Sequence, residues 1–242
     1  MIAAAGSGQR LGAGGPKAFV ELGGRPLIEW SLAALGAART IGAIVIAAPA
    51  NYVREAELAA SLAAPAATVV VTPGGATRAA SIAAALQHVR GDLVAIHDAA
   101  RPLITPALVD RVVDRLDREA GAESVIAAAP LTDTIKLART ARDSGSGTAA
   151  EGGDPTTVAE TLSRDALWSA ETPQAFRLVA LERAQRRAAD AGELDAATDE
   201  AWLIERAGGT VLLEETGTAN FKVTTAADLA AAAALIAAAE SR

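Results

Sequence analysis

Short apolar runs alternate with amphipathic stretches along most of this 242-residue chain. Such runs are typical of strands that are buried on both faces of a parallel sheet. We expect six of them to form the strands of one sheet, at Ile2–Ala5, Ala43–Ala47, Thr68–Val71, Leu93–Ile96, Ser124–Ala128 and Val211–Leu213.

The stretches between these runs carry apolar residues at helical spacing. One opens at Pro26, a favoured first residue of a helix, and ends near Gly36. Strands that alternate with helices predict βαβ units and an α/β fold with a doubly wound, mostly parallel sheet. Ligands bind such sheets beyond the carboxyl ends of the strands, so we expect the chemistry in the loops that follow strands. The other predicted helices run from about Tyr52 to Leu62, Arg78 to Val89, Pro106 to Glu119, Leu178 to Ala191, Asp199 to Ala207 and Ala226 to Ala239.

The alternation breaks between residues 130 and 164. A polar segment rich in Gly, Ser and Asp, Arg142–Pro155, lies there between two segments with strand-forming residues, Asp133–Leu137 and Thr156–Leu162. It is either a disordered surface loop or the tip of a projecting hairpin arm. Because α/β chains of this length often form one domain, we predict a single domain over residues 1–242, with an arm inserted at about 130–165.

Composition narrows the class of protein. The chain has no cysteine, which excludes a disulfide framework, a cysteine-ligated metal site and a cysteine nucleophile. Its longest apolar run, Leu229–Ala239, has 11 residues, well short of the ~20 that cross a bilayer. A net charge of −7 argues against nucleic acid and membrane surfaces as partners. We therefore expect a soluble, cytoplasmic protein.

Lysine is rare in this chain. Of the 22 basic residues, only Lys17, Lys136 and Lys222 are lysines. A strong preference for arginine is typical of coding bias, so each lysine that remains is a candidate for a specific role. Lysine presents a compact point charge where arginine presents a planar fork, and the two differ at phosphate sites.

The first predicted strand leads into a loop with five glycines between residues 6 and 15. Glycines allow backbone N–H groups to approach an anion closely, as in phosphate-binding loops. The loop is not a dinucleotide fingerprint, because Leu11 stands where the third glycine belongs, and it is not a P-loop, because Lys17 follows proline. It can wrap a triphosphate with a cation, Arg10 or Lys17, at either end, or it is a mobile turn.

Two further loops follow predicted strands. In the first, two glycines precede Arg78 and Ser81, which share one face of a helix's first turn and could hold a base edge and a phosphate; an ordinary turn is the simpler interpretation. In the second, an apolar strand ends at Asp98, and a single carboxylate at a strand end is typical of Mg²⁺ held together with substrate phosphates. Asp98 could instead cap a helix. We expect the neighbouring His97 to pack and hydrogen-bond rather than to bind a metal.

Seven motifs, in chain order, carry a resemblance to a known family. They are GSGQRLGAGGPK, GGATRAAS, HDAARP, DTIK, ETPQAF, TDEA and FKVTT. With this set the chain resembles the 2-C-methyl-D-erythritol 4-phosphate cytidylyltransferases over essentially its whole length. The resemblance implies a Rossmann-like fold whose β-arm interlocks two subunits into a homodimer. It also implies Mg²⁺-dependent transfer of the cytidylyl group of CTP to 2-C-methyl-D-erythritol 4-phosphate, with release of pyrophosphate, in non-mevalonate isoprenoid precursor synthesis.

The family's functional residues carry over to matching positions of this chain. Arg10 and Lys17 match the pair that stabilises the transition state at the CTP phosphates. Asp98 matches the aspartate associated with Mg²⁺, and Arg164 and Lys222 match the cations that align the sugar phosphate for reaction. The resemblance implies that the nucleotide is bound by Ala4, Ala5, Gly6, Ser7, Gly8, Gly75, Arg78, Ser81 and Ala99. It implies that the sugar phosphate is bound by Arg101, Thr134, Arg164, Thr172, Thr198 and Lys222, with the arm residues supplied by the partner subunit.

Two positions depart from the family pattern. Ala76 stands where a polar residue often follows the second pair of glycines, so contacts from that side chain are absent. Thr218 and Ala219 stand before Asn220, at a place where some family members carry an acidic residue. The resemblance therefore does not carry over a contact near Lys222.

No general base is expected, because the attacking group, a phosphate monoester, is already ionised at neutral pH. Competing interpretations are a cytidylyltransferase for another polyol phosphate such as ribitol 5-phosphate, a dehydrogenase on a dinucleotide fold, and a dimeric binding module without catalysis. Seven cations map to the motifs and are expected to gather around one pocket, namely Arg10, Lys17, Arg78, Arg101, Lys136, Arg164 and Lys222.

Overall fold

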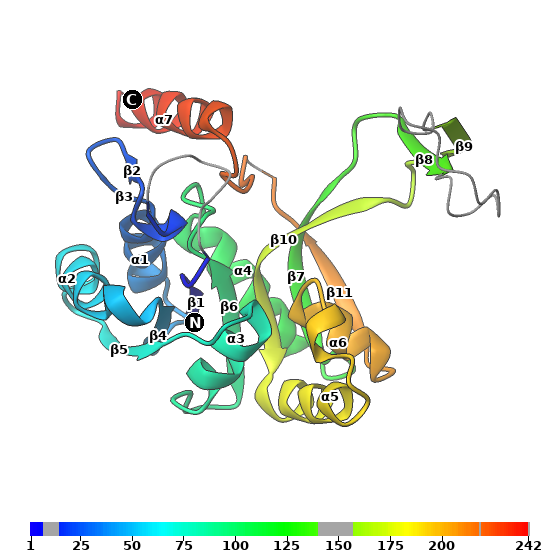
Figure 1. The fold of residues 1–242 in the computed structure, drawn as a ribbon, viewed down its shortest axis with the longest axis horizontal. Helices are drawn as coiled ribbons and strands as arrows, with labels where there is room; N and C mark the ends of the chain where they lie inside the picture. Colours follow the sequence, from blue (N-terminus) through cyan, green and yellow to red (C-terminus); the bar gives the residue numbers. More distant parts are fainter. Residues whose placement is uncertain (7–14, 140–156, 218, 242) are drawn as a thin grey trace, which may run out of the picture.

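The computed structural model describes residues 1–6, 15–139, 157–217 and 219–241. Within them, seven strands form one sheet in the order β11-β7-β10-β6-β1-β4-β5 (Figure 1). Neighbouring strands are parallel, except that β10 runs antiparallel to both β6 and β7. The predicted doubly wound, mostly parallel α/β fold is confirmed. The strands are β1 (Ile2–Ala3), β4 (Ala43–Ala48), β5 (Thr68–Pro73), β6 (Leu93–Asp98), β7 (Ser124–Pro130), β10 (Trp168–Arg177) and β11 (Val211–Glu215).

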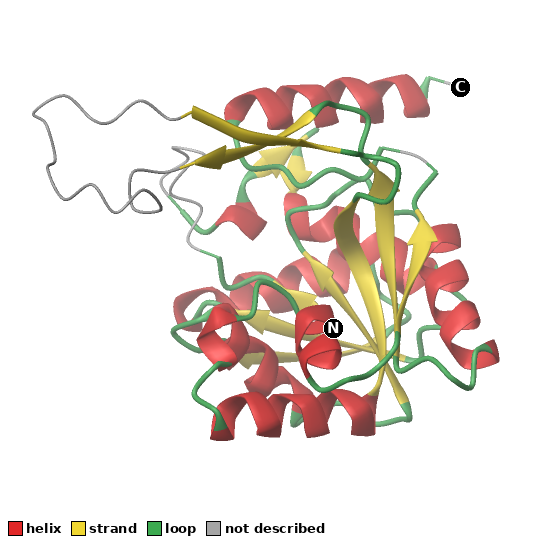
Figure 2. Cartoon of the chain, turned by 90° about the vertical axis from the view of Figure 1, so that its right-hand side faces the viewer, coloured by secondary structure: helices red, strands yellow, loops and turns green. Residues whose placement is uncertain are grey.

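Helices cover both faces of this sheet, as Figure 2 shows. Alternate residues of β4 point to opposite layers: Ile44 and Ile46 belong to the buried cluster that includes α1 and α2, while Val45 and Ala47 belong to the cluster that includes α3, α5 and α6. Since both faces are covered, strands of this kind are apolar throughout, which is why the short apolar runs predicted them. The helices are α1 (Leu27–Ala37), α2 (Val53–Ala63), α3 (Arg78–Leu86), α4 (Pro106–Arg118), α5 (Leu178–Asp190), α6 (Glu200–Arg206) and α7 (Ala226–Glu240).

The apolar pattern did not predict strand β10. Its buried half, Glu171–Phe176, carries Glu, Thr, Pro and Gln, so no apolar run marks it. Its pairing with β7 is irregular between Ala170 and Gln174, where the strand passes the cleft described below. Polar residues are unusual in a strand at the middle of a sheet, so those of β10 indicate a functional role.

Two predicted strands differ in detail from the observed ones. We expected Thr68–Val71 to be a buried strand, but β5 is an edge strand in which Thr68 and Val70 are exposed. The first strand was expected to reach Ala5, whereas β1 ends at Ala3. The residues that follow, 4–6, form part of one wall of the cleft.

Two small antiparallel pairs stand outside the main sheet. Strands β8 (Ile135–Arg139) and β9 (Thr157–Leu162) pair with each other at the end of a projection formed by β7 and β10 (Figure 1). They overlap the two segments predicted to flank the arm, Asp133–Leu137 and Thr156–Leu162; the tip expected at Arg142–Pro155 lies outside the described residues. Strands β2 (Glu21–Leu22) and β3 (Arg25–Pro26) form the other pair.

Helix α7 packs on this second pair and on α1. Leu22 and Leu27 form a buried cluster with Val223, Ala232 and Ile236. This cluster anchors the segment that leads into α7 and carries Lys222. No helix in the described ranges has the length and apolar character needed to cross a membrane.

The interior is built largely from small residues, since 63 of the 242 residues are alanine. Phe176 is the largest of the fully buried side chains, and it packs with Ile126 and Leu181 between the sheet and α5. Small neighbours leave little scope for collapse around a void, because an alanine cannot reorient to fill it.

We therefore expect Phe176→Ala to lower the free energy of unfolding by about 3–5 kcal/mol. Val179→Ala is the control: it removes an exposed side chain nearby and should change that free energy by less than about 0.5 kcal/mol. Urea denaturation measures both. A loss below about 1 kcal/mol for Phe176→Ala would contradict the packing described here.

Candidate active site

A cleft of about 480 Å³ opens at the carboxyl ends of β1 and β6. Three loops that follow strands contribute its walls, as expected for an open α/β sheet. The segment before α7 closes one side. The lining residues are 3–6, 17, 18, 75–78, 81, 98–100, 222 and 224.

The loop after β1 forms the first wall. Ala4 is buried and donates its backbone N–H to Ala47 of β4, at 2.9 Å. Gly6 accepts a hydrogen bond from the backbone N–H of Lys17 at 3.1 Å, so the two ends of the glycine-rich loop meet at the cleft. Lys17 opens a short 3₁₀ helix, Lys17–Phe19, and lines the cleft. The predicted residues Ser7, Gly8 and Arg10 lie outside the described residues.

The loop after β5 forms the second wall and is shaped by Ser81. The Ser81 hydroxyl accepts from the backbone N–H of Gly75 at 3.1 Å and donates to the carbonyl of Thr77 at 2.9 Å. Thr77 caps α3 by accepting from the N–H of Ala80. A Cβ on Gly75 would lie only 2.5 Å from that of Ala80, so glycine is required for this close approach. Gly75, Arg78 and Ser81 all line the cleft.

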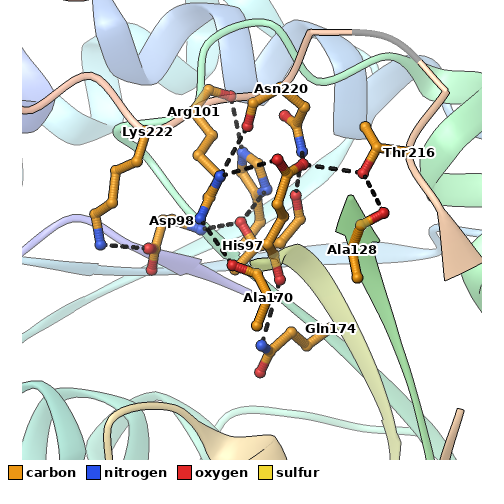
Figure 3. Close-up of polar contacts among 11 residues, drawn as sticks. His97, Asp98, Arg101, Ala128, Ala170, Gln174, Thr216, Asn220 and Lys222 are labelled. Carbon is orange, nitrogen blue, oxygen red and sulfur yellow. Dashed lines mark hydrogen bonds and ion pairs between the residues drawn. The ribbon is translucent and has the colours of Figure 1, made fainter. Parts of the chain in front are cut away.

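Asp98, the last residue of β6, is the electrostatic centre of the cleft. Its carboxylate lies 2.6 Å from Lys222 Nζ and 3.6 Å from Arg78 Nη2 (Figure 3 shows the first of these pairs). Burial alone would raise the pKa of Asp98, but the charges of Lys222 and Arg78 outweigh burial and lower the pKa to about 2. Asp98 is therefore ionised throughout the physiological range.

Glu200 is a second buried carboxylate at this site, and it was not among the residues predicted from the sequence. It opens α6, is 3% exposed, and accepts a hydrogen bond from Arg78 Nη1 at 2.7 Å. Arg78 thus lies between two carboxylates, Glu200 and Asp98. Burial raises the pKa of Glu200, and the charge of Arg78 opposes that rise. The motif TDEA was a signal for this residue, but only the neighbouring Thr198 was selected from it.

Thr172, which is hydrogen-bonded to His97, fixes the backbone of Asp98. His97 Nε2 lies 3.2 Å from the carbonyl of Arg101, so this nitrogen carries the proton and Nδ1 accepts from the Thr172 hydroxyl at 2.9 Å. That hydroxyl in turn accepts the backbone N–H of Asp98 at 3.1 Å. Both ring nitrogens are therefore used, and burial lowers the pKa of His97 to about 3. The expectation that His97 packs and hydrogen-bonds is met.

Arg101 does not line the cleft, but it directly follows the lining residues Asp98, Ala99 and Ala100. Its guanidinium donates to the backbone carbonyls of Asn220, at 2.8 Å, and Ala170, at 3.3 Å (Figure 3). Thr172 is likewise 4% exposed and serves the hydrogen bonds just described. Within one chain, both of these predicted substrate residues organise the wall of the cleft.

The remaining predicted substrate residues lie away from the described lining of the cleft. Thr134 precedes β8, and Arg164 follows β9 and bonds to the carbonyl of Thr132; both are exposed. Thr198 is exposed just before α6. Seven cations were expected around one pocket, and three of them, Lys17, Arg78 and Lys222, line it. Arg101 lies next to the lining, and Arg10 is outside the described residues. Lys136 and Arg164 belong to the projection. A single chain separates these groups because the projection carries its residues away from the sheet.

Asp98 has the chemistry to hold a magnesium ion. The ionised carboxylate faces the cleft, and Mg²⁺ is usually held by one or two carboxylates together with substrate phosphates. Among the described residues, no group of three or more His, Cys, Asp or Glu is arranged to hold a metal. The donor set thus fits an ion whose remaining ligands come from a phosphate substrate and water.

A cleft at strand ends, lined by backbone and by cations, defines an anion-binding α/β protein of the nucleotide-binding type. Comparisons with known proteins then specify the family. The model of the 2-C-methyl-D-erythritol 4-phosphate cytidylyltransferase family matches residues 1–238, and the chain belongs to this family.

Relatives and solved structures agree with this assignment. The 2-C-methyl-D-erythritol 4-phosphate cytidylyltransferase of Synechococcus sp. (strain WH7803) is 39% identical over 240 residues, covering 98% of both chains. The crystal structure of the enzyme of that name from Thermus thermophilus is 31% identical, covers 97% of this chain and 96% of its own, and has a TM-score of 0.71. A bifunctional enzyme, IspD/IspF, of Anaeromyxobacter dehalogenans is 39% identical, and this chain spans 56% of it.

The neutral, buried state of His97 predicts how stability changes with pH. Its folded pKa of about 3 lies below the ordinary 6.5, so unfolding takes up a proton at acidic pH. Its contribution is complete above pH 6.5 and is lost as the pH falls towards 3. Lowering the pH from 7 to 5 should therefore destabilise the wild type by about 2 kcal/mol more than His97→Gln.

Urea denaturation at both pH values measures this difference. His88→Gln is the control, because it replaces the chain's other histidine, which is exposed just beyond the end of α3. The same pH dependence in wild type and His97→Gln would show that His97 is not held neutral.

Proposed function

We propose that this chain transfers the cytidylyl group of CTP to 2-C-methyl-D-erythritol 4-phosphate, giving 4-diphosphocytidyl-2-C-methyl-D-erythritol and pyrophosphate. The observation that carries the proposal is the cleft itself, where Arg78 and Lys222 pair with Asp98 at the carboxyl ends of the strands and Lys17 lines the same cleft. The family match over residues 1–238 supplies the substrates. It favours methylerythritol phosphate over ribitol 5-phosphate, a dehydrogenase reaction or binding without catalysis.

The reaction brings two anions together. An oxygen of the sugar phosphate attacks the α-phosphorus of CTP, the bond from that phosphorus to the β-phosphate oxygen breaks, and pyrophosphate leaves. The attacking oxygen is already ionised, so the neutral, fully hydrogen-bonded His97 has no proton to remove. Positioning and charge stabilisation are the protein's contribution.

Each cation has a separate place in this scheme. Lys17, at the end of the glycine-rich loop, stabilises charge on the triphosphate together with Arg10. Arg78, at the first turn of α3, lies where a helix N-terminus favours phosphate, and Ser81 and Gly75 shape the pocket for the base. Lys222, across the cleft, reduces the repulsion that the incoming monoester experiences.

Magnesium is the cofactor that we propose, with Asp98 as the residue that holds it. The ion would supply further positive charge at the phosphates. The ion pairs of Asp98 with Lys222 and Arg78 keep this carboxylate deprotonated and aimed at the cleft.

The arm supports a homodimer as the working form. A two-stranded pair is at best marginally stable alone in water, yet β8 and β9 expose Leu137 and Val158. A second copy that covers this pair would bury them, and it would bring the partner's arm with Thr134 and Arg164 to the sugar-phosphate side. The cysteine-free, acidic chain and its nucleotide substrate support a cytoplasmic location.

The test of the function is pyrophosphate release from CTP and Mg²⁺, with methylerythritol phosphate or ribitol 5-phosphate as the acceptor. We expect release with the first acceptor to exceed release with the second at equal concentration. Faster release with ribitol 5-phosphate, or release with neither acceptor, would contradict the proposal.

Lys17→Ala should lower kcat by well over tenfold, because it removes charge stabilisation at the triphosphate. The fold should remain intact, as judged by the melting temperature. Arg54→Ala, which removes an exposed cation from α2, is the control and should keep wild-type turnover. Near-normal turnover in Lys17→Ala would remove this lysine from the mechanism.

Arg164→Ala should mainly impair use of the sugar phosphate. We expect KM for methylerythritol phosphate to rise about tenfold or more, while KM for CTP changes little, because the arm faces only the second substrate. Steady-state kinetics with each substrate varied in turn measure this. Unchanged kinetics would remove the arm from the site.

A further inference from the structure

A buried carboxylate with no place in the proposed reaction lies behind the cleft. Glu171, in the irregular part of β10, is 8% exposed. Its Oε2 accepts hydrogen bonds from the Thr216 hydroxyl and from Asn220 Nδ2, both at 2.9 Å. The two bonds thus meet on one carboxylate oxygen of Glu171. Because a buried charge is costly unless it is paired, this arrangement demands an explanation.

The same carboxylate faces Arg101. Arg101 Nη1 lies 3.8 Å from Glu171 Oε1 and donates to the carbonyl of Asn220 at 2.8 Å. The side chain of Arg101 is also largely buried, at 11% exposed. Glu171 and Arg101 thus compensate each other's charge, and each also binds Asn220, one at its side chain and the other at its backbone.

Asn220 therefore has little freedom to move. Its Nδ2 also donates to the carbonyl of Thr172 at 2.8 Å, so β10 holds it at two points. Thr216, which is held by Glu171 as well, comes directly after β11. Glu171 thus holds the chain at two points between β11 and Lys222, namely Thr216 and Asn220.

Lys222 follows Asn220 by two residues. The hydrogen bonds that hold Asn220 therefore limit where the backbone of Lys222 can lie. Its side chain is 42% exposed, and its ammonium reaches Asp98 at 2.6 Å. Beyond it, Val223 donates its N–H to the carbonyl of Ala100 at 2.8 Å. The backbone at Lys222 is therefore held from one side by Val223 and from the other by Asn220, which sets the point from which its ammonium reaches Asp98.

We propose that Glu171 is a positioning residue, which through Asn220 and Arg101 places the ammonium of Lys222 for the polyol phosphate. The inference rests on the proposed function, because that function gives Lys222 its substrate. Charge-assisted hydrogen bonds are about twice as strong as neutral ones, which suits a carboxylate that must hold a loop. A displacement of about 1 Å at such a residue can lower a rate by about a hundredfold.

A purely structural role for Glu171 predicts a different result. It would lower stability and the fraction of folded enzyme, and both substrates would be affected alike. A positioning role predicts a selective effect on the substrate that Lys222 binds, in enzyme that is still folded. The KM values of the two substrates separate these roles.

The experiment compares Glu171→Ala and Glu171→Gln with Glu214→Ala. Glu214 is a matched control, since it is a partly buried carboxylate of β11 that accepts from Arg111 at 3.1 Å and Arg115 at 2.9 Å, away from the lining of the cleft. For each protein we would measure the melting temperature, both KM values and kcat. Turnover of the wild type with methylerythritol phosphate is measured first, because the variants are compared with it.

We expect Glu171→Ala to raise KM for methylerythritol phosphate at least tenfold, with KM for CTP within twofold of wild type. Glu171→Gln keeps one acceptor oxygen and should recover part of this loss, and it carries the test alone if the alanine variant does not fold. Glu214→Ala should leave both KM values within twofold, even if its melting temperature falls. Equal changes in both KM values, or no change in either, would overturn the proposal.

A second readout does not depend on turnover. Acylation of lysines by a small activated ester, followed by mass spectrometry, reports how accessible each ammonium is. Loss of the anchor should make Lys222 react at least threefold faster relative to Lys136 in Glu171→Ala or Glu171→Gln. An inactive wild type would contradict the proposed function, whereas an unchanged Lys222 rate would contradict this inference by itself.

Discussion

The ion pairs of Asp98 are the interaction on which the rest of the site depends. A carboxylate that is almost wholly buried at the end of β6 stays ionised only because cations reach it from two directions, Arg78 from α3 and Lys222 from the segment before α7. Glu200 in α6 holds Arg78 from its other side. Four parts of the chain that are far apart in sequence thus meet at one charged cluster, and the cleft has the shape that this cluster gives it.

The alternation of cations and carboxylates also explains how an acidic protein presents a site for two anions. The chain has a net charge of −7, yet Lys17, Arg78 and Lys222 are gathered on one cleft. Each carboxylate in contact with them, Asp98 or Glu200, holds a cation in place when no substrate is bound. The glycine-rich loop and the loop before α3 add backbone groups that suit phosphates, because glycine leaves the backbone open to an approaching anion.

Much of the fold was predictable because both faces of the central strands are buried. The apolar runs predicted β4, β6 and β7 closely, since residues on both faces of these strands must be apolar. Strand β10 was missed because Glu171, Thr172 and Gln174 serve the site, so its sequence is not that of a core strand. The loops that follow strands marked Lys17 and Asp98, and the family resemblance added Lys222; all three line the cleft. Glu171 and Glu200 stand in the motifs ETPQAF and TDEA, but their roles were not predicted, because these roles arise from contacts with residues about 50 and 120 positions away in the chain.

The central claim is that two anionic substrates occupy opposite sides of this cleft, one at Lys17 and the other at Lys222. The chain has only three lysines, so acylation of each can be followed separately by mass spectrometry. The account predicts that CTP with Mg²⁺ slows the acylation of Lys17, and that methylerythritol phosphate slows that of Lys222. If saturating CTP and methylerythritol phosphate leave both lysines reacting at the rates of the free protein, the account is wrong.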